Sequence, residues 1–121
     1  MTQSLALGLT LFIECMICGL YLTRIPPPRP SLFAGLIICI AASCFTHPVA
    51  WMLNTTWSAT FGTWATILTL EVLVILVEGL VYRLALTIPA ASALRLSIAT
   101  NAGSFLAGLV LYWYGLDGAG P

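Results

Sequence analysis

The chain has 121 residues, of which 60% are hydrophobic and 7% are charged, and its formal net charge is zero. A soluble domain carries about a quarter charged residues, so this composition excludes an ordinary soluble protein. It also provides no basic surface for nucleic acid. We therefore expect a single integral membrane domain over residues 1–121 that contacts the lipid bilayer and has no nucleic-acid partner.

Four apolar segments are long enough to cross a bilayer, which takes about 20 residues of helix. They cover residues 4–23, 32–53, 63–86 and 93–114. The predicted fold class is all-α: a polytopic membrane protein with a four-transmembrane-helix bundle and a loose tail at 115–121. We expect the first segment to be a retained helix, because it lacks the basic leader and the small-residue cleavage site of a signal peptide.

The breaks between these segments carry residues that end or begin helices. The first break, Thr23–Ser31, is rich in proline, and Ser31 is a candidate N-cap for the second helix. The second break, Asn54–Gly62, is small and polar and predicts a loop. Pro89 is expected to end the third helix, and Ser92 to cap the fourth.

All basic residues lie beside the first and third breaks. They are Arg24, Arg29, Arg83 and Arg95. The positive-inside rule makes both breaks cytoplasmic, so both termini and the 54–62 loop are predicted to be extracytoplasmic. The aromatic residues agree with this orientation, because amphipathic rings favour the membrane interfaces. The expected outer set is Trp51, Trp57, Trp64 and Trp113, and the inner set is Tyr21 and Tyr82. The predicted location is a bacterial inner membrane.

Three of the four acidic residues fall inside the predicted membrane helices. They are Glu14, Glu71 and Glu78, whereas Asp117 lies in the polar tail. A carboxyl group at bilayer depth is costly, so such residues are rare, face the interior of a bundle and usually serve a function. These three glutamates are the main candidates for a functional site.

Polar residues recur at helical spacing and give each helix one polar face. The four faces are Gln3, Thr10, Glu14, Cys18 and Tyr21; Gly35, Cys39, Ser43 and His47; Trp64, Glu71, Glu78 and Tyr82; and Ser97, Asn101, Ser104 and Gly108. Depth along the helices, at about 1.5 Å per residue, predicts two groups. Glu14, His47 and Glu71 form a proton or cation site, and Glu78, Asn101 and Ser104 form an inner relay or gate.

Two carboxyl groups and one imidazole can hold or pass a proton, or bind a cation that displaces protons. The alternative is structural: His47 hydrogen-bonded to a neutral glutamate would hold helices together. His47, Glu14 and Glu71 are also weak candidates for metal ligands. Pro48, which follows His47, frees a backbone carbonyl and favours a kink.

Cys15 and Cys18 have the spacing of a redox pair, but a redox pair needs an accessible thiolate and these residues lie inside a membrane helix. We expect them to pack as small apolar residues. His47 could ligate a tetrapyrrole, which no other feature of the chain supports. No nucleophile elbow, phosphate loop or paired-carboxylate hydrolase motif is present, so neither an enzyme nor a cofactor is predicted.

The chain resembles the small multidrug resistance transporters in its size, its four spans and the glutamate at the centre of its first helix. Glu14 matches the position at which that family exchanges protons for cationic drugs, and the segment Ser31–Phe45 (SLFAGLIICIAASCF) has a similar texture. The family's glycine-containing third-helix motif is replaced by Glu71-Val-Leu-Val-Ile-Leu-Val-Glu78. The resemblance implies an antiparallel dimer and proton-coupled export.

Two further resemblances were found. Asn101-Ala-Gly-Ser-Phe-Leu-Ala-Gly108 is similar to a stretch in the dual-topology fluoride channels. The pattern Thr46-His47-Pro48-x-x-Trp51, with Glu71, Glu78 and Asn101, resembles one that recurs in small bacterial membrane proteins.

The sequence therefore favours two functions. The first is proton- or cation-linked transport or permeation of a small solute or ion, as a homo-oligomer or with partner membrane subunits. The second is a non-catalytic accessory or assembly subunit of a larger membrane complex, in which the polar faces hold helices or partners together. An aqueous cavity that reaches Glu14 would favour transport, and a sealed, fully paired interior would favour the subunit.

Overall fold

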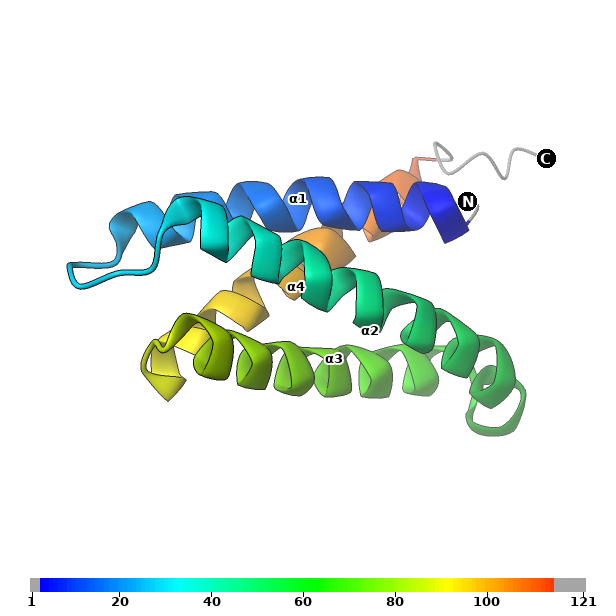
Figure 1. Ribbon diagram of the computed structural model, residues 1–121. Coiled ribbons are helices and arrows are strands. Elements are labelled where there is room, and N and C mark those ends of the chain that lie inside the picture. The colour runs from blue at the N-terminus through cyan, green and yellow to red at the C-terminus, as the bar shows by residue number, and fades with distance from the viewer. Residues whose placement is uncertain (1–2, 115–121) are drawn as a thin grey trace.

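The computed structural model describes residues 3–114 of the chain, and this part is entirely helical apart from short connections. The four helices are α1 (Gln3–Arg24), α2 (Leu32–Phe61), α3 (Thr63–Leu86) and α4 (Ala90–Trp113) (Figure 1). All four are long and apolar enough to cross a membrane. The prediction of an all-α bundle of four membrane helices is confirmed. The predicted tail at 115–121 lies outside the described residues.

The helices alternate in direction around a ring. Each of α1 and α3 packs against both α2 and α4, and within residues 3–114 α1 does not pack against α3, nor α2 against α4. The start of α1, the end of α4 and the α2–α3 turn lie at one end of the bundle, which we call the terminal end (Figure 1). The two longer connections, 25–31 and 87–89, lie at the opposite end together with all four arginines, and we call this the arginine end. Which end faces the cytoplasm stays a prediction.

The sequence located both ends of α3 and the start of α2 closely. Residues 63–86 match α3, and Ser31 is the N-cap of α2, where its hydroxyl oxygen accepts a hydrogen bond from the Ala34 amide at 3.1 Å. Ser92 is not an N-cap, because α4 begins two residues earlier at Ala90 and Pro89 occupies the cap position. Proline suits a helix start, where its missing N–H leaves no bond unmade.

The predicted loop at Asn54–Gly62 is wrong, because α2 continues to Phe61. The hydroxyl groups of this segment form hydrogen bonds with backbone carbonyls of the same helix. Thr55 donates a hydrogen bond to the Met52 carbonyl at 2.7 Å, and Ser58 donates to the Asn54 carbonyl at 2.6 Å. The helix ends at Phe61, and its C-cap is Gly62, whose φ of 82° is one that favours glycine. It also runs through Pro48 without interruption.

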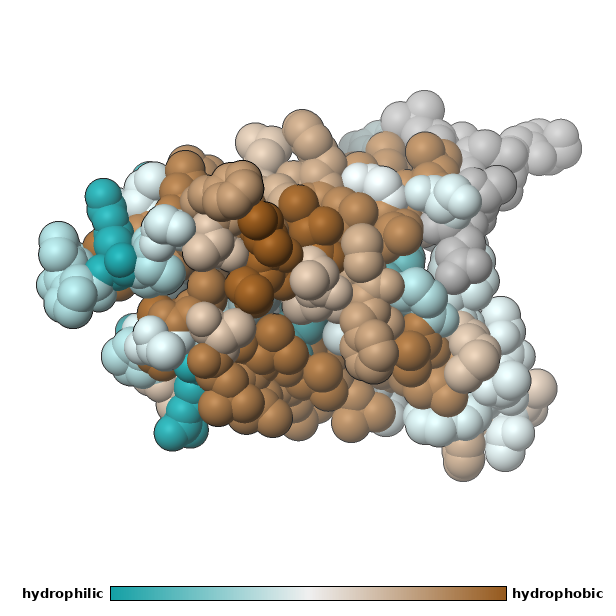
Figure 2. Space-filling view, in the orientation of Figure 1, coloured by the Kyte–Doolittle hydropathy of each residue, from teal (hydrophilic) through white to brown (hydrophobic). Residues whose placement is uncertain are grey.

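The bundle shows the burial pattern of a membrane protein. Large apolar side chains cover the outside, and Figure 2 shows them over the middle of one face with hydrophilic residues toward the ends. The buried apolar core lies toward the arginine end and includes Cys18, Leu22, Cys39, Tyr82 and Leu96.

Two aromatic residues differ from expectation. Tyr82 is buried in this core, where its hydroxyl contacts the Cys39 sulfur at 3.6 Å, and does not reach the inner interface. Its position on the inward face of α3, four residues after Glu78, accounts for the difference. Trp51 is half-buried because its position on the polar face of α2 places it on the wall of an internal cavity.

A close approach of α1 and α2 depends on Gly35. A Cβ atom there would clash with Cδ1 of Leu22, which is 2% exposed and cannot swing away freely. At Gly8, an added Cβ would meet nothing within 4 Å.

We predict that Gly35→Ala makes the bundle less stable than Gly8→Ala by about 1–3 kcal/mol. Both substitutions gain the same helix propensity, so their difference isolates the clash with Leu22. The free energy of unfolding in mixed detergent micelles, followed by tryptophan fluorescence, measures it. Equal stability of the two variants would contradict the close packing described for α1 and α2.

Candidate functional site

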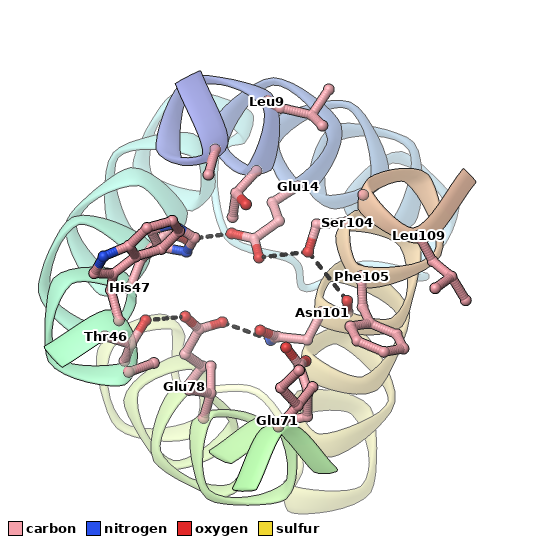
Figure 3. Close-up of a pocket in the computed structure, with 18 of the residues that line it drawn as sticks. Leu9, Glu14, Thr46, His47, Glu71, Glu78, Asn101, Ser104, Phe105 and Leu109 are labelled. Atoms are coloured by element: carbon pink, nitrogen blue, oxygen red, sulfur yellow. Dashed lines mark hydrogen bonds between the residues drawn. The ribbon is translucent and has the colours of Figure 1, made fainter. Parts of the chain in front are cut away.

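A cavity of about 750 Å³ occupies the half of the bundle toward the terminal end. All four helices line it, and it extends from Glu14 and Glu78 in the middle of the spans to Thr63 and Tyr112 near the helix ends. Figure 3 shows glutamate side chains pointing into the central space from α1 and α3. The cavity therefore ends on a layer of polar side chains, which we call the floor. The floor consists of Glu14, Ser43, Thr46, Glu78, Asn101 and Ser104.

Glu14 is the α1 residue of the floor and is 1% exposed. Its carboxyl group accepts hydrogen bonds from two neighbouring helices. The Ser43 hydroxyl of α2 donates to Oε2 in a short contact, and the Ser104 hydroxyl of α4 donates to Oε1 at 3.2 Å. Glu14 thus joins α1 to both helices that flank it.

Glu78 holds the equivalent place on α3 and is also 1% exposed. The Thr46 hydroxyl of α2 donates to Oε1 at 2.6 Å, and the Asn101 amide of α4 donates to Oε2 at 2.7 Å. The two carboxyl groups therefore stand opposite each other, and α2 and α4 supply the donors of both (Figure 3).

The spacing of the donors explains this layer. Ser43 and Thr46 are three residues apart on α2, and Asn101 and Ser104 are three residues apart on α4, so each pair shares one face of its helix. One member of each pair is directed toward Glu14 and the other toward Glu78. The sequence pattern therefore places two matched donor sets at one depth.

The hydroxyl groups of the floor have a choice of acceptor. Each carries one proton, yet Ser43 lies 3.0 Å from the Cys39 carbonyl as well as against Glu14, and Thr46 lies 3.0 Å from the Ala42 carbonyl as well as against Glu78. When the glutamate is a carboxylate, the hydroxyl group donates its proton to it. When the glutamate is protonated, the hydroxyl group donates to the backbone carbonyl of its own helix and accepts a hydrogen bond from the carboxyl group. Rotation of a hydroxyl thus accommodates both protonation states without a helix movement.

His47 and Glu71 line the cavity above the floor. The Nε2 atom of His47 is buried and has no hydrogen-bond partner in the described structure, and its ring lies 6.4 Å from that of Trp51. The Glu71 carboxyl group makes no hydrogen bond with residues of the described chain. Seven residues of α3 place Glu71 about 10 Å above Glu78 along the helix.

The structure thus groups the predicted site residues differently from the expectation. Glu14, His47 and Glu71 share one cavity but are not hydrogen-bonded to one another, because Glu14 is held by serines of α2 and α4. The expected contact between Glu78 and Asn101 is present. Ser104, expected beside that pair, lies 3.0 Å from the Asn101 carbonyl and also contacts Glu14, at 3.2 Å. The roles of these residues stay predictions.

Sequence reasoning missed Ser43 and Thr46 as direct partners of the glutamates. Ser43 was placed on the polar face of its helix, and Thr46 is three residues from it and one from His47. A hydroxyl residue on such a face, level with an acidic residue of a neighbouring helix, was the available signal.

The described part of the chain contains no assembled set of metal ligands. Within residues 3–114, no three histidine, cysteine, aspartate or glutamate side chains are grouped so that they could hold a metal ion. The weak candidates Glu14, His47 and Glu71 are among those residues. Cys15 and Cys18 are both free thiols, half-buried and buried, respectively.

Comparisons of the chain with protein-family models, with curated proteins and with solved structures found no match.

We predict that Glu78→Leu lowers the stability of the bundle by about 1–2 kcal/mol relative to Glu71→Leu. Both changes remove one carboxyl group from α3, but only Glu78 loses hydrogen bonds to α2 and α4. The free energy of unfolding in mixed micelles measures the difference.

In a double-mutant cycle, Glu78→Leu and Asn101→Leu should couple by about 1 kcal/mol, and additive effects would rule out the contact.

Proposed function

We propose that this small integral membrane protein carries out proton- or cation-linked transport or permeation of a small solute or ion. Glu14 is the main protonation site, and Glu78 with Asn101 and Ser104 forms the inner relay or gate. His47 and Glu71 tune the site from the cavity wall. The protein acts as a homo-oligomer, or with partner membrane subunits, in a bacterial inner membrane.

The cavity that reaches Glu14 and Glu78 carries this proposal. It joins the middle of the spans to the terminal end, so a small solute or water can approach two membrane-buried carboxyl groups from one side. In a purely structural core, these carboxyl groups would be enclosed by packed side chains and would not line a cavity. Carboxyl groups that line a water-filled cavity within membrane helices are typical of proton and ion pathways.

The packed half of the bundle toward the arginine end favours a gated pathway rather than a permanently open pore. Below the floor, Leu22, Leu86 and Leu96 pack closely with Tyr82. A solute that enters from the terminal end therefore stops at the floor. Passage requires a second arrangement of the helices in which this core opens, as in alternating access.

The floor also suits reversible proton binding. Its hydroxyl groups can turn between the glutamates and the backbone carbonyls of their own helices. Both the charged and the neutral carboxyl group therefore find hydrogen-bond partners in the same backbone structure, which keeps the cost of changing the proton count low.

We predict that Glu14→Gln abolishes proton-coupled flux, because an amide cannot bind and release the proton. The purified protein is reconstituted into vesicles that contain a pH indicator, and Na⁺, K⁺, methylammonium and benzylammonium gradients are imposed in turn. The wild type should move protons faster than protein-free vesicles with at least one of these cations. The Glu14→Gln variant should fall to the protein-free rate.

Met16→Leu is the matched control, because Met16 lies on the same helix but is exposed on the outer surface. Its flux should equal that of the wild type. A wild type that moves no protons with any of the four cations, or a Glu14→Gln variant with unchanged flux, would refute the proposal. Stoichiometric co-purification with other membrane subunits, together with no flux by the isolated protein, would support the accessory-subunit alternative.

A further inference from the structure

We propose that the cavity above the floor is a binding site for a protonated amine with a small apolar body, and that Glu71 is the residue that binds its charge. The inference rests on the proposed function, because it names the class of solute that enters the cavity. It assigns recognition to a different glutamate from the one that handles the proton.

The free hydrogen-bonding capacity in the cavity determines this assignment. The oxygens of Glu14 and Glu78 already accept hydrogen bonds from α2 and α4. Glu71 has no such partner among the described residues, and the Nε2 atom of His47 is buried without one. Buried polar atoms in proteins are nearly always hydrogen-bonded, so the unpaired Nε2 of His47 on α2 indicates a missing partner. The half-buried carboxyl group of Glu71 on α3 lines the same cavity and is free to bind a ligand there.

The charge of the cavity selects a cation. Its lining includes three glutamates and no arginine, and all four arginines of the chain lie at or beyond the opposite half of the bundle. An anion would therefore meet carboxyl groups and no guanidinium group in a surrounding of low dielectric constant. An ammonium group placed at Glu71 gains a charge-assisted hydrogen bond of the strong type.

The size and walls of the cavity favour an organic cation over a metal ion. A volume of about 750 Å³ falls in the range of small-molecule sites, whereas Na⁺ or Ca²⁺ requires a close shell of oxygen ligands. Trp51, Trp64, Ile67 and Leu109 supply apolar and aromatic walls of the same cavity. Aromatic faces bind both apolar bodies and cations.

Gly108 leaves the space that such a body would fill. It lines the cavity on α4, and a Cβ atom added to it would meet nothing within 4 Å. From the contact of Asn101 with Glu78, the antiparallel α3 and α4 bring Gly108 to the depth of Glu71. A side chain at this position would occupy the site without touching the floor.

The test compares three probes of one shape that differ in charge: benzylammonium, benzyl alcohol and benzoate. Binding to the wild-type protein in phosphatidylcholine nanodiscs is measured by titration calorimetry, with empty nanodiscs as the blank. Benzylammonium should bind roughly tenfold or more tightly than benzyl alcohol, as expected for one charge-assisted hydrogen bond. Benzoate should bind most weakly.

Two variants locate the site. Glu71→Gln should remove the preference for benzylammonium, and its stability should remain that of the wild type because Glu71 makes no hydrogen bond to lose. Gly108→Leu should abolish binding of both benzylammonium and benzyl alcohol. Gly8→Leu introduces the same side chain at a glycine whose surroundings are equally open but which lies outside the cavity lining, and it should leave binding unchanged.

Equal affinity of the wild type for benzylammonium and benzyl alcohol would overturn the inference, as would a preference that survives Glu71→Gln. Flux driven by Na⁺ or K⁺ in a protein that does not bind benzylammonium would refute this inference and leave the proposed function standing. Specific binding at Glu71 without proton flux would support the site and refute transport.

Discussion

The structure depends on the need to supply hydrogen-bond donors to two carboxyl groups buried in an apolar bundle. Glu14 and Glu78 lie on opposite helices, and each accepts from both α2 and α4. A carboxyl group without donors at this depth would cost several kcal/mol. Because any relative sliding or rotation of one helix would break bonds to two neighbours, this layer fixes the depth and rotation of all four helices, which apolar packing alone specifies weakly in lipid.

The same layer divides the bundle into two unlike halves. Toward the arginine end, small side chains permit close approach: Gly35 faces Leu22, and Cys18 and Cys39 are fully buried. Toward the terminal end, larger residues such as Trp51 line the wall and leave about 750 Å³ between the helices. The floor is thus the boundary between a space that can hold water or a solute and a packed core. In the proposed function, proton exchange with the cavity would take place at that boundary.

The sequence predicted the parts of the structure that depend on long-range composition. Four apolar segments of bilayer length give four helices, and the polar faces correctly turn Glu14, Glu78 and Asn101 inward. The end of α2 could not be predicted, because Thr55 and Ser58 satisfy their hydroxyl groups within the helix and such residues are equally suited to a loop. The hydrogen-bond partner of Glu14 could not be predicted either. Helical spacing gives the face of a residue, whereas its neighbour depends on helix rotation and crossing angle, and these place Ser43, not His47, against Glu14.

The separation of Glu71 from the floor supplies a physical basis for coupling a solute to a proton. The two glutamates of α3 are one heptad apart, about 10 Å along the helix. Two unit positive charges at that distance repel by roughly 1.7 kcal/mol at an effective dielectric constant near 20. In the proposed function, a cation bound at Glu71 would therefore disfavour a proton at the relay residue Glu78, and a proton there would weaken the binding of the cation. This energy lies within the range of known couplings between sites. Because both positions lie on the one continuous helix α3, this coupling would need no conformational signal, and exclusion of one charge by the other would follow from their spacing in the sequence.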